Sequence, residues 1–286
     1  MSLTALREEI AHEIRSRLRR LRPEVRFDDS HPHRVRDARD NLAPGVDYEQ
    51  LRGDLLGGAA ESGHGRTVFD ELCDIDSSAT LAANIFGPFR SAPELLSLPG
   101  LPSFNVLRLG KRLRTGLGGP PAYLRMLALG GDGILGGSCV LTEPLSMRTA
   151  NLADSCAPAV AEMASPEWSS LYDSLCANPA RFRSLDATAL VRQYLGLRSA
   201  LADEPQSKTL LYVFWEPLDW PDIPAAVEHR REIVEFSLAV AGSDIAFVSM
   251  SCSELWDAME EGPEWAGRAE WLAYLRGRYL FEAKPV

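Results

Sequence analysis

The run KTLLYVFWEP at residues 208–217 is the feature that most restricts what this chain can fold into. Apolar and aromatic residues follow one another there without polar alternation, and Pro217 ends the run. A strand with this pattern is buried on both faces, as in the parallel sheets of α/β proteins. The sequence therefore predicts a buried strand in an α/β fold.

Further strand and helix patterns alternate along the chain. Strands are expected at 103–110, 122–129, 134–144 and 244–250. Helices are expected at 1–20, 47–58, 76–88, 167–178, 186–202, 222–241, 251–259 and 264–281. An Arg- and Gly-rich turn is expected at 111–121, and the turn GGDG joins two of the strands into a hairpin. We expect one α/β domain over 1–286, with an N-terminal helical arm at 1–66 and the core at 67–286.

The composition is that of an ordinary globular protein. The chain has 286 residues, of which 45% are hydrophobic and 24% charged. No run approaches the roughly 20 apolar residues of a membrane span, and residues 1–20 contain no apolar signal core. We therefore expect a cytoplasmic protein without membrane contact.

The charge bears on the choice of partner. A net charge of −10 disfavours broad nucleic-acid binding, although a local basic patch remains compatible with it. Four arginines gather near the end of the first expected helix: Arg15, Arg17, Arg19 and Arg20. Both a solvated helix face and a nucleic-acid-binding arm are consistent with them.

Cysteine and histidine spacing gives little sign of a metal site. The five cysteines are odd in number and contain no CxxC pair, so we expect free, mostly buried thiols. His31 and His33 lie two residues apart without other clustered ligands. We expect no metal and no cofactor.

Several stretches, taken in order, resemble one protein superfamily. They are DSSATLAANIFGPF, RTGLGGPPAYLRMLALGGDGILGGSCVLTEPL, LVRQYLGLR, TLLYVFWEP, SCSELW and YLRGRY. Their sequence and spacing resemble the PD-(D/E)XK, restriction-endonuclease-like proteins common in bacteria, over about residues 40–280. The resemblance implies a PD-(D/E)XK nuclease-like core, which is a central mixed β-sheet flanked by helices. Fold alone does not imply function.

The resemblance also implies a metal site that this sequence does not supply. A nuclease of this type holds a divalent cation with carboxylates, and a lysine beside them steadies the developing charge. The corresponding positions are read as Gly110, Arg125, Ser138 and Val140. Glu143 is expected about 16 Å beyond Ser138 and on the opposite strand face. We therefore expect metal-dependent nuclease activity to be lost.

The replacements have chemistry of their own. Arg125 repels a divalent cation and attracts an anion, Ser138 adds a hydroxyl, and Tyr123 faces the same side as Arg125. These three are the candidate catalytic residues, and Arg112 is a candidate substrate-binding residue on the face of Gly110. An alternative stays open, in which Arg125 pairs with a nearby Asp or Glu and only fills the abandoned site.

Three further residues are candidates for substrate binding, and each has a structural alternative. Asp76 and Ser77 open the helix that packs near the site in this superfamily, and either can act as a helix cap. His229 lies on the long helix, where a structural histidine is the alternative to a base. Cys139 alternates with Ser138 and Val140 and is expected to be a packed thiol.

Three functions follow, in order of preference. The first is a pocket repurposed to bind or transform a small polar or anionic molecule, for instance as a metal-independent enzyme of specialised-metabolite biosynthesis. The second is a pseudonuclease that binds DNA or a protein. The third is an active nuclease with relocated ligands. Neither the substrate nor the oligomeric state follows from the sequence.

Overall fold

A five-stranded mixed sheet forms the centre of the described part of the chain. The computed structural model describes residues 2–57 and 68–283. The sheet has the order β1 (Val106–Leu113), β2 (Ala122–Leu129), β3 (Gly133–Val140), β4 (Ser207–Phe214) and β5 (Ile245–Ser251). β1, β2 and β3 pair antiparallel, whereas β3, β4 and β5 pair parallel. The apolar run at 208–217 contains most of β4. The place of β4 between two parallel neighbours explains why its residues 210–214 are all apolar or aromatic.

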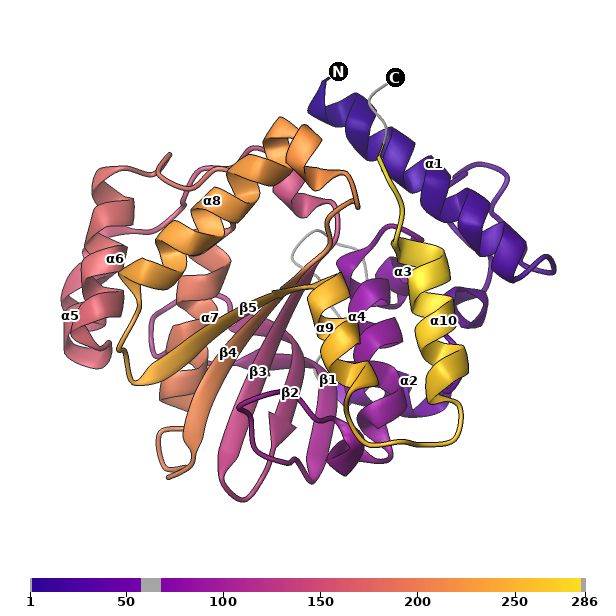
Figure 1. Cartoon of the computed structure of the whole chain (residues 1–286). Coiled ribbons are helices and arrows are strands. Elements are labelled where there is room, and N and C mark those ends of the chain that lie inside the picture. Colours follow the sequence, from indigo (N-terminus) through magenta and orange to yellow (C-terminus); the bar gives the residue numbers. More distant parts are fainter. Residues whose placement is uncertain (1, 58–67, 284–286) are drawn as a thin grey trace.

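Helices cover both faces of this sheet (Figure 1). One face carries α5 (Ala157–Met163), α6 (Pro166–Ala177), α7 (Ala187–Ala200) and α8 (Pro224–Ala239). The other carries α1 (Leu3–Leu21), α2 (Tyr48–Gly57), α3 (Val68–Cys73), α4 (Ser78–Phe86), α9 (Cys252–Glu260) and α10 (Arg268–Tyr279). The buried apolar side chains form two clusters, which correspond to the two faces. The α/β fold class is therefore confirmed, with helices on both sides of one sheet.

The expected strands differ from the observed ones at two ends. β1 continues to Leu113, because residues 111–113 pair with β2 rather than forming the expected turn. β3 ends at Val140, so its expected extension to residue 144 is wrong. The following residues form the 3₁₀ helix η4 (Glu143–Leu145) instead. Both differences lie beside the candidate site described below.

The N-terminal helix α1 packs into the larger of the two clusters. Leu6, Ile10, Ile14 and Leu18 are buried, at the helical spacing that the sequence showed. α1 packs against α10, and the guanidinium of Arg17 donates to the Gly277 carbonyl oxygen at 3.1 Å. The first and last helices of the chain are therefore side by side (Figure 1).

A buried carboxylate fixes the loop that leads into α7. Glu232 of α8 is 1% exposed and accepts hydrogen bonds from the backbone N–H groups of residues 183–185 at 2.7–2.8 Å. Asp186 then caps α7 by accepting from the Ala189 N–H at 2.9 Å. Together these contacts set the position of α7 over the sheet.

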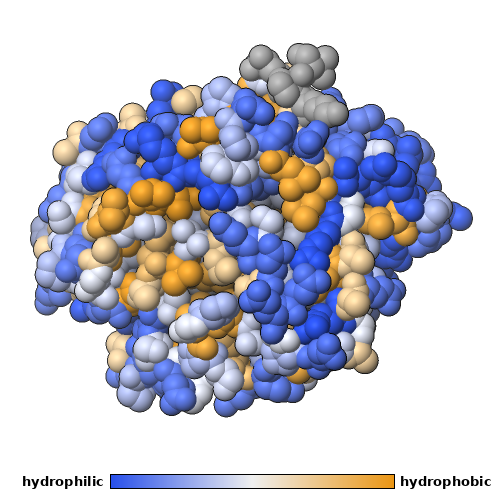
Figure 2. All heavy atoms as spheres, in the orientation of Figure 1, coloured by the Kyte–Doolittle hydropathy of each residue, from blue (hydrophilic) through white to orange (hydrophobic). Residues whose placement is uncertain are grey.

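The face of the molecule drawn in Figure 2 is mostly hydrophilic, with several small apolar areas. Figure 2 shows apolar side chains gathered over the region of α8 and β5. Val227, Val234 and Leu238 of α8 are among the exposed large hydrophobic residues. Within residues 2–57 and 68–283, no helix has both the length and the apolar character needed to cross a bilayer.

Candidate functional site

The sheet splits where β2 and β3 part. Their pairing runs from Leu129 with Ile134 to Met126 with Gly137, and the described register stops there. A pocket of about 340 Å³ occupies the split. Its lining residues are Pro120, Pro121, Ala122, Tyr123, Arg125, Ser138, Cys139, Val140, Glu143, Arg148, Asp186, Ala189, Leu190, Arg192, Gln193 and Tyr212. The three candidate catalytic residues, Tyr123, Arg125 and Ser138, thus line one pocket.

Arg125 forms an ion pair with a helix on the α4 side of the sheet. Its guanidinium donates to Glu71 of α3 at 3.0 Å and lies 5.1 Å from the centre of the Tyr123 ring. Both partners are mostly buried, with side chains 21% and 24% exposed. Burial lowers the pKa of Arg125, but Tyr123 and Glu71 outweigh this and raise it, so the charge persists. The pair matches the alternative in which Arg125 meets a nearby carboxylate.

Ser138 belongs to the opposite face of the sheet, where it meets α7. The side-chain amide of Gln193 donates to the Tyr123 carbonyl oxygen at 2.9 Å and to Ser138 Oγ at 3.4 Å. Gln193 therefore bridges the two parted strands. Its other amide atom, Oε1, is buried and has no hydrogen-bond partner among the described residues. Because Nε2 is committed to a carbonyl oxygen, the orientation of this amide is fixed.

Sequence reasoning did not find Gln193. The signal was present, since Gln193 lies three residues after Leu190 and four before Leu197, both of which are buried. A polar residue at that spacing lies on the core-facing side of a helix. Gln193 itself is 5% exposed. A buried amide in this place needs partners, and its Oε1 atom has none in the part of the chain that the structure describes.

Glu143 lies in the pocket, contrary to its expected place on the far face. The expectation extended β3 too far, whereas the chain turns back at η4. Glu143 accepts from Ser78 Oγ at 2.5 Å and from the Leu141 N–H at 2.9 Å. Its carboxylate thus joins the start of α4 to the end of β3.

His229 reaches the pocket only through Tyr212. Its Nε2 lies 2.9 Å from the Tyr212 hydroxyl, and His229 is 3% exposed. Burial, with a contribution from Arg230, lowers the pKa of His229 to about 3. Burial also raises the pKa of Tyr212 well above its usual value. Both side chains are therefore neutral at pH 7.

The remaining candidates lie outside the residues that line this pocket. Arg112 is paired with Tyr123 across β1 and β2 and so shares its face. Ser77 caps α4 by accepting from the Thr80 N–H at 3.0 Å. Asp76 precedes this cap, and burial raises its pKa. The structure brings none of the three to the pocket lining.

The residues at the four expected metal-site positions do not fit a divalent cation. Gly110 lies across from Arg125, because their neighbours pair on either side. None of Gly110, Arg125, Ser138 and Val140 offers a carboxylate oxygen, the ligand that Mg²⁺ prefers. Glu71 is turned to Arg125. Across the described residues, no group of three His, Cys, Asp or Glu side chains is placed to hold a metal ion.

The cysteines behave as packed thiols. All five are free, as expected, but only Cys139 and Cys252 are buried, whereas Cys73, Cys156 and Cys176 are partly exposed, so the expectation of mostly buried thiols holds for two of the five. Burial raises the pKa of Cys139 to about 12, so its thiol stays protonated near neutral pH. Cys139 lines the pocket without being an activated nucleophile.

Two more arginines line the pocket. Arg148 donates to Asp186 at 2.7 Å, and 43% of its side chain is exposed. Arg192 donates to the Pro120 carbonyl oxygen. The pocket therefore combines three guanidinium groups with the carboxylates of Glu143 and Asp186.

Comparisons of the chain with family models, with curated proteins and with solved structures found no match. The structure itself shows a five-stranded mixed sheet with helices on both faces.

Proposed function

We propose that the chain is a PD-(D/E)XK-like protein whose site is rewritten to bind a small polar molecule with an anionic group. The observation that carries this proposal is an unsatisfied acceptor on Gln193, a residue that lines the pocket: its buried Oε1 has no hydrogen-bond partner among the described residues. A buried acceptor left without a hydrogen bond costs about 1–3 kcal/mol. A ligand N–H or O–H at this atom offsets that cost.

The arginines supply the hydrogen-bond donors for the anionic group of the proposed ligand. Arg125, Arg148 and Arg192 line the same pocket, and guanidinium groups pair with carboxylates and phosphates in a planar, two-point geometry. A volume of about 340 Å³ suits a small molecule and lies at the lower end of typical ligand pockets. Glu143 and Asp186 balance part of the positive charge, which favours a ligand of mixed polarity over a highly charged one.

Binding receives more support than proton-transfer chemistry. A general acid or base at neutral pH works best with a pKa near 7. The pKa of His229 is lowered to about 3 and that of Tyr212 is raised well above 10, so neither changes its charge near pH 7. Tyr212 and His229 instead form a neutral hydrogen-bonded pair, and Tyr212 of this pair lines the pocket.

The nucleic-acid alternative receives less support from the basic end of α1. The guanidinium groups of Arg15 and Arg19 lie 4.7 and 4.9 Å from the Phe27 ring centre. Arg17 and Arg20 both contact Glu13. These arginines are engaged within the chain, which leaves a weaker basic surface for phosphates.

The test begins with a thermal-shift screen of small carboxylates, amino acids and sugar phosphates. With the strongest hit, we expect Gln193→Met to weaken binding by at least about tenfold, as loss of a buried hydrogen bond implies. Gln206→Met is the matched control. The Oε1 of Gln206 is also buried without a partner in the described chain, but it lies outside the pocket lining. A screen without any saturable hit, or equal losses in both variants, contradicts the proposal.

A further inference from the structure

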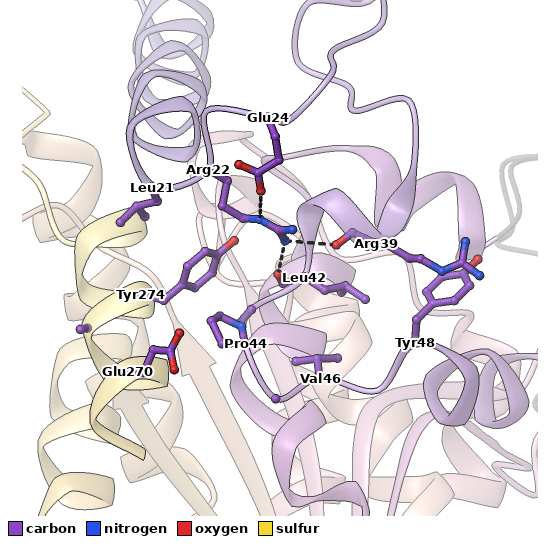
Figure 3. Close-up of a pocket in the computed structure, with 13 residues that line it drawn as sticks. Leu21, Arg22, Glu24, Arg39, Leu42, Pro44, Val46, Tyr48, Glu270 and Tyr274 are labelled. Carbon is purple, nitrogen blue, oxygen red and sulfur yellow. Dashed lines mark hydrogen bonds and ion pairs between the residues drawn. The ribbon is translucent and has the colours of Figure 1, made fainter. Parts of the chain in front are cut away.

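A second, larger hollow lies between the end of α1, residues 42–48 and α10 (Figure 3). We call it the α1–α10 groove, and its volume is about 750 Å³. Its lining residues are Leu21, Arg22, Glu24, Arg39, Leu42, Ala43, Pro44, Gly45, Val46, Tyr48, Glu270, Ala273 and Tyr274. It shares no lining residue with the pocket at the split of the sheet. Its role is therefore separate from the proposed function.

Behind the groove lies a buried arginine whose described partners are all neutral. Arg278 is fully buried and donates to the Asn41 carbonyl oxygen at 2.7 Å and to the Tyr274 hydroxyl at 2.9 Å. It also donates to the Ile75 carbonyl oxygen at 3.2 Å. Its Nε has no hydrogen-bond partner among the described residues. A buried charge without a counter-ion is costly, and it places a positive potential beside the groove.

Tyr274 connects this charge to the groove. It is 6% exposed and lines the groove, and its hydroxyl oxygen accepts from Arg278. The hydroxyl proton must therefore point elsewhere, and the described residues offer it no acceptor at hydrogen-bond distance. Figure 3 shows the hydroxyl end of Tyr274 turned toward the guanidinium of Arg22. A donor polarised by a neighbouring cation makes a strong hydrogen bond to an anion.

Arg22 supplies a second donor at the same end of the groove. Its Nε donates to Glu24 at 3.0 Å, and its Nη1 reaches the carbonyl oxygens of Arg39 and Leu42 at 3.3 and 3.2 Å. These contacts hold the guanidinium in place, and Nη2 makes no hydrogen bond within residues 2–57 and 68–283. Apolar side chains also line the groove: Leu21, Leu42, Pro44 and Val46.

We infer that the α1–α10 groove binds a monocarboxylate with an apolar body. One carboxylate oxygen accepts from the Tyr274 hydroxyl and the other from Arg22, while the apolar body packs against Leu42, Pro44 and Val46. The carboxylates of Glu24 and Glu270 also line the groove, and their charge opposes a dianion such as a phosphate monoester. A single negative charge fits both the donors and this acidic rim.

The test uses sodium octanoate as the probe, with octan-1-ol and inorganic phosphate for comparison, measured by calorimetry on the full chain. We expect saturable binding of octanoate and much weaker binding of the other two. Tyr274→Phe keeps the ring and removes the hydroxyl, and we expect it to bind octanoate about tenfold more weakly. Tyr48→Phe is the matched control, because Tyr48 also lines the groove but contacts Arg39 through its ring, 4.2 Å from the guanidinium.

Each other outcome overturns the inference. Equal binding of octanoate and octan-1-ol shows an apolar groove without an anion site. Equal octanoate affinity in Tyr274→Phe and the native chain shows that the Tyr274 hydroxyl is not a donor to the ligand. An absence of octanoate binding shows that the groove is not a carboxylate site. A thermal melt of Tyr274→Phe confirms that the variant is folded. Because the groove and the pocket share no lining residue, the Gln193 experiment is unaffected by any of these results.

Discussion

Arg125 stands where the nuclease-like resemblance implies a carboxylate, and it meets Glu71 there at 3.0 Å. A fixed guanidinium repels a divalent cation at close range, and its pairing lowers the desolvation cost of keeping the charge inside. The pair therefore explains how the sheet tolerates a mostly buried cation at its split end. It also means that an anionic ligand at Arg125 shares the guanidinium with Glu71.

The buried His229 gives a pH dependence of stability with a definite sign. Its pKa is lowered from 6.5 to about 3 in the folded chain. Between these values the unfolded chain binds the proton and the folded chain does not, so stability falls as the pH falls through this window. We expect the native chain to lose about 2 kcal/mol more than His229→Gln between pH 7 and pH 5, measured by urea unfolding.

The control for this experiment is His12→Gln, because His12 is exposed on α1. It should follow the native chain at both pH values. If the native chain and His229→Gln lose the same free energy of unfolding on acidification, burial does not hold the histidine neutral. The assignment of Tyr212 and His229 as a neutral hydrogen-bonded pair is then wrong.

The candidate site was only partly predictable at this scale. Tyr123 and Arg125 alternate on one strand, and simple strand geometry placed them together. Ser138 was also found, although it meets α7 on the opposite face. Glu71 and Gln193 were missed, because each comes from a helix whose distance to the pocket depends on tertiary packing that strand periodicity does not contain.

At the scale of the element, Gly110 shapes the edge strand beside the site. It has φ 65°, a conformation that glycine adopts without the Cβ penalty of other residues. An added Cβ would lie 2.5 Å from Leu55 Cδ2 and 3.0 Å from the Tyr123 hydroxyl. A glutamate at this position, which the resemblance implies, would therefore be strained by the left-handed backbone and would have to displace the Leu55 and Tyr123 side chains.

Gly110→Ala should lower the free energy of unfolding by about 1–3 kcal/mol, through the left-handed backbone and the close contacts. Gly53→Ala is the matched control. Gly53 lies within α2, and an added Cβ there meets nothing within 4 Å. We expect this control to be neutral or to gain about 0.5–1 kcal/mol from helix propensity. If Gly110→Ala and Gly53→Ala change the free energy of unfolding by the same amount in urea, the claim that the backbone at Gly110 requires glycine is wrong.

Elements were predicted better in their interiors than at their ends. β2 matches the expected 122–129, because its residues are apolar or aromatic apart from Arg125 and a glycine turn follows it. β1 extends through the charged residues Lys111 and Arg112 to Leu113, since pairing with β2 outweighs the polarity of the two charged residues. β3 stops early because Glu143 is drawn back to Ser78 and Leu141. Both ends depend on long-range partners.

At the scale of the whole molecule, the absence of a metal-ligand group within the described residues gives a direct test of the nuclease alternative. We expect calorimetric titration with Mg²⁺ and Mn²⁺ to show no saturable binding, and plasmid DNA to remain intact in the same buffer. Cleavage that requires metal would overturn the assignment of Gly110, Arg125, Ser138 and Val140 as the rewritten positions.

The pairing of α1 with α10 has a consequence for synthesis on the ribosome. The hydrogen bond from Arg17 to Gly277 joins residues 260 positions apart. At about 5–20 residues per second, roughly 13–50 s pass between translation of the two partners. During that time the apolar face of Leu6, Ile10, Ile14 and Leu18 lacks its contacts with α10, although η4, which also packs against α1, is synthesised before α10. The nascent chain therefore exposes part of the apolar face of α1 until α10 leaves the ribosome. We expect chaperones that bind apolar segments at the ribosomal exit to bind this helix.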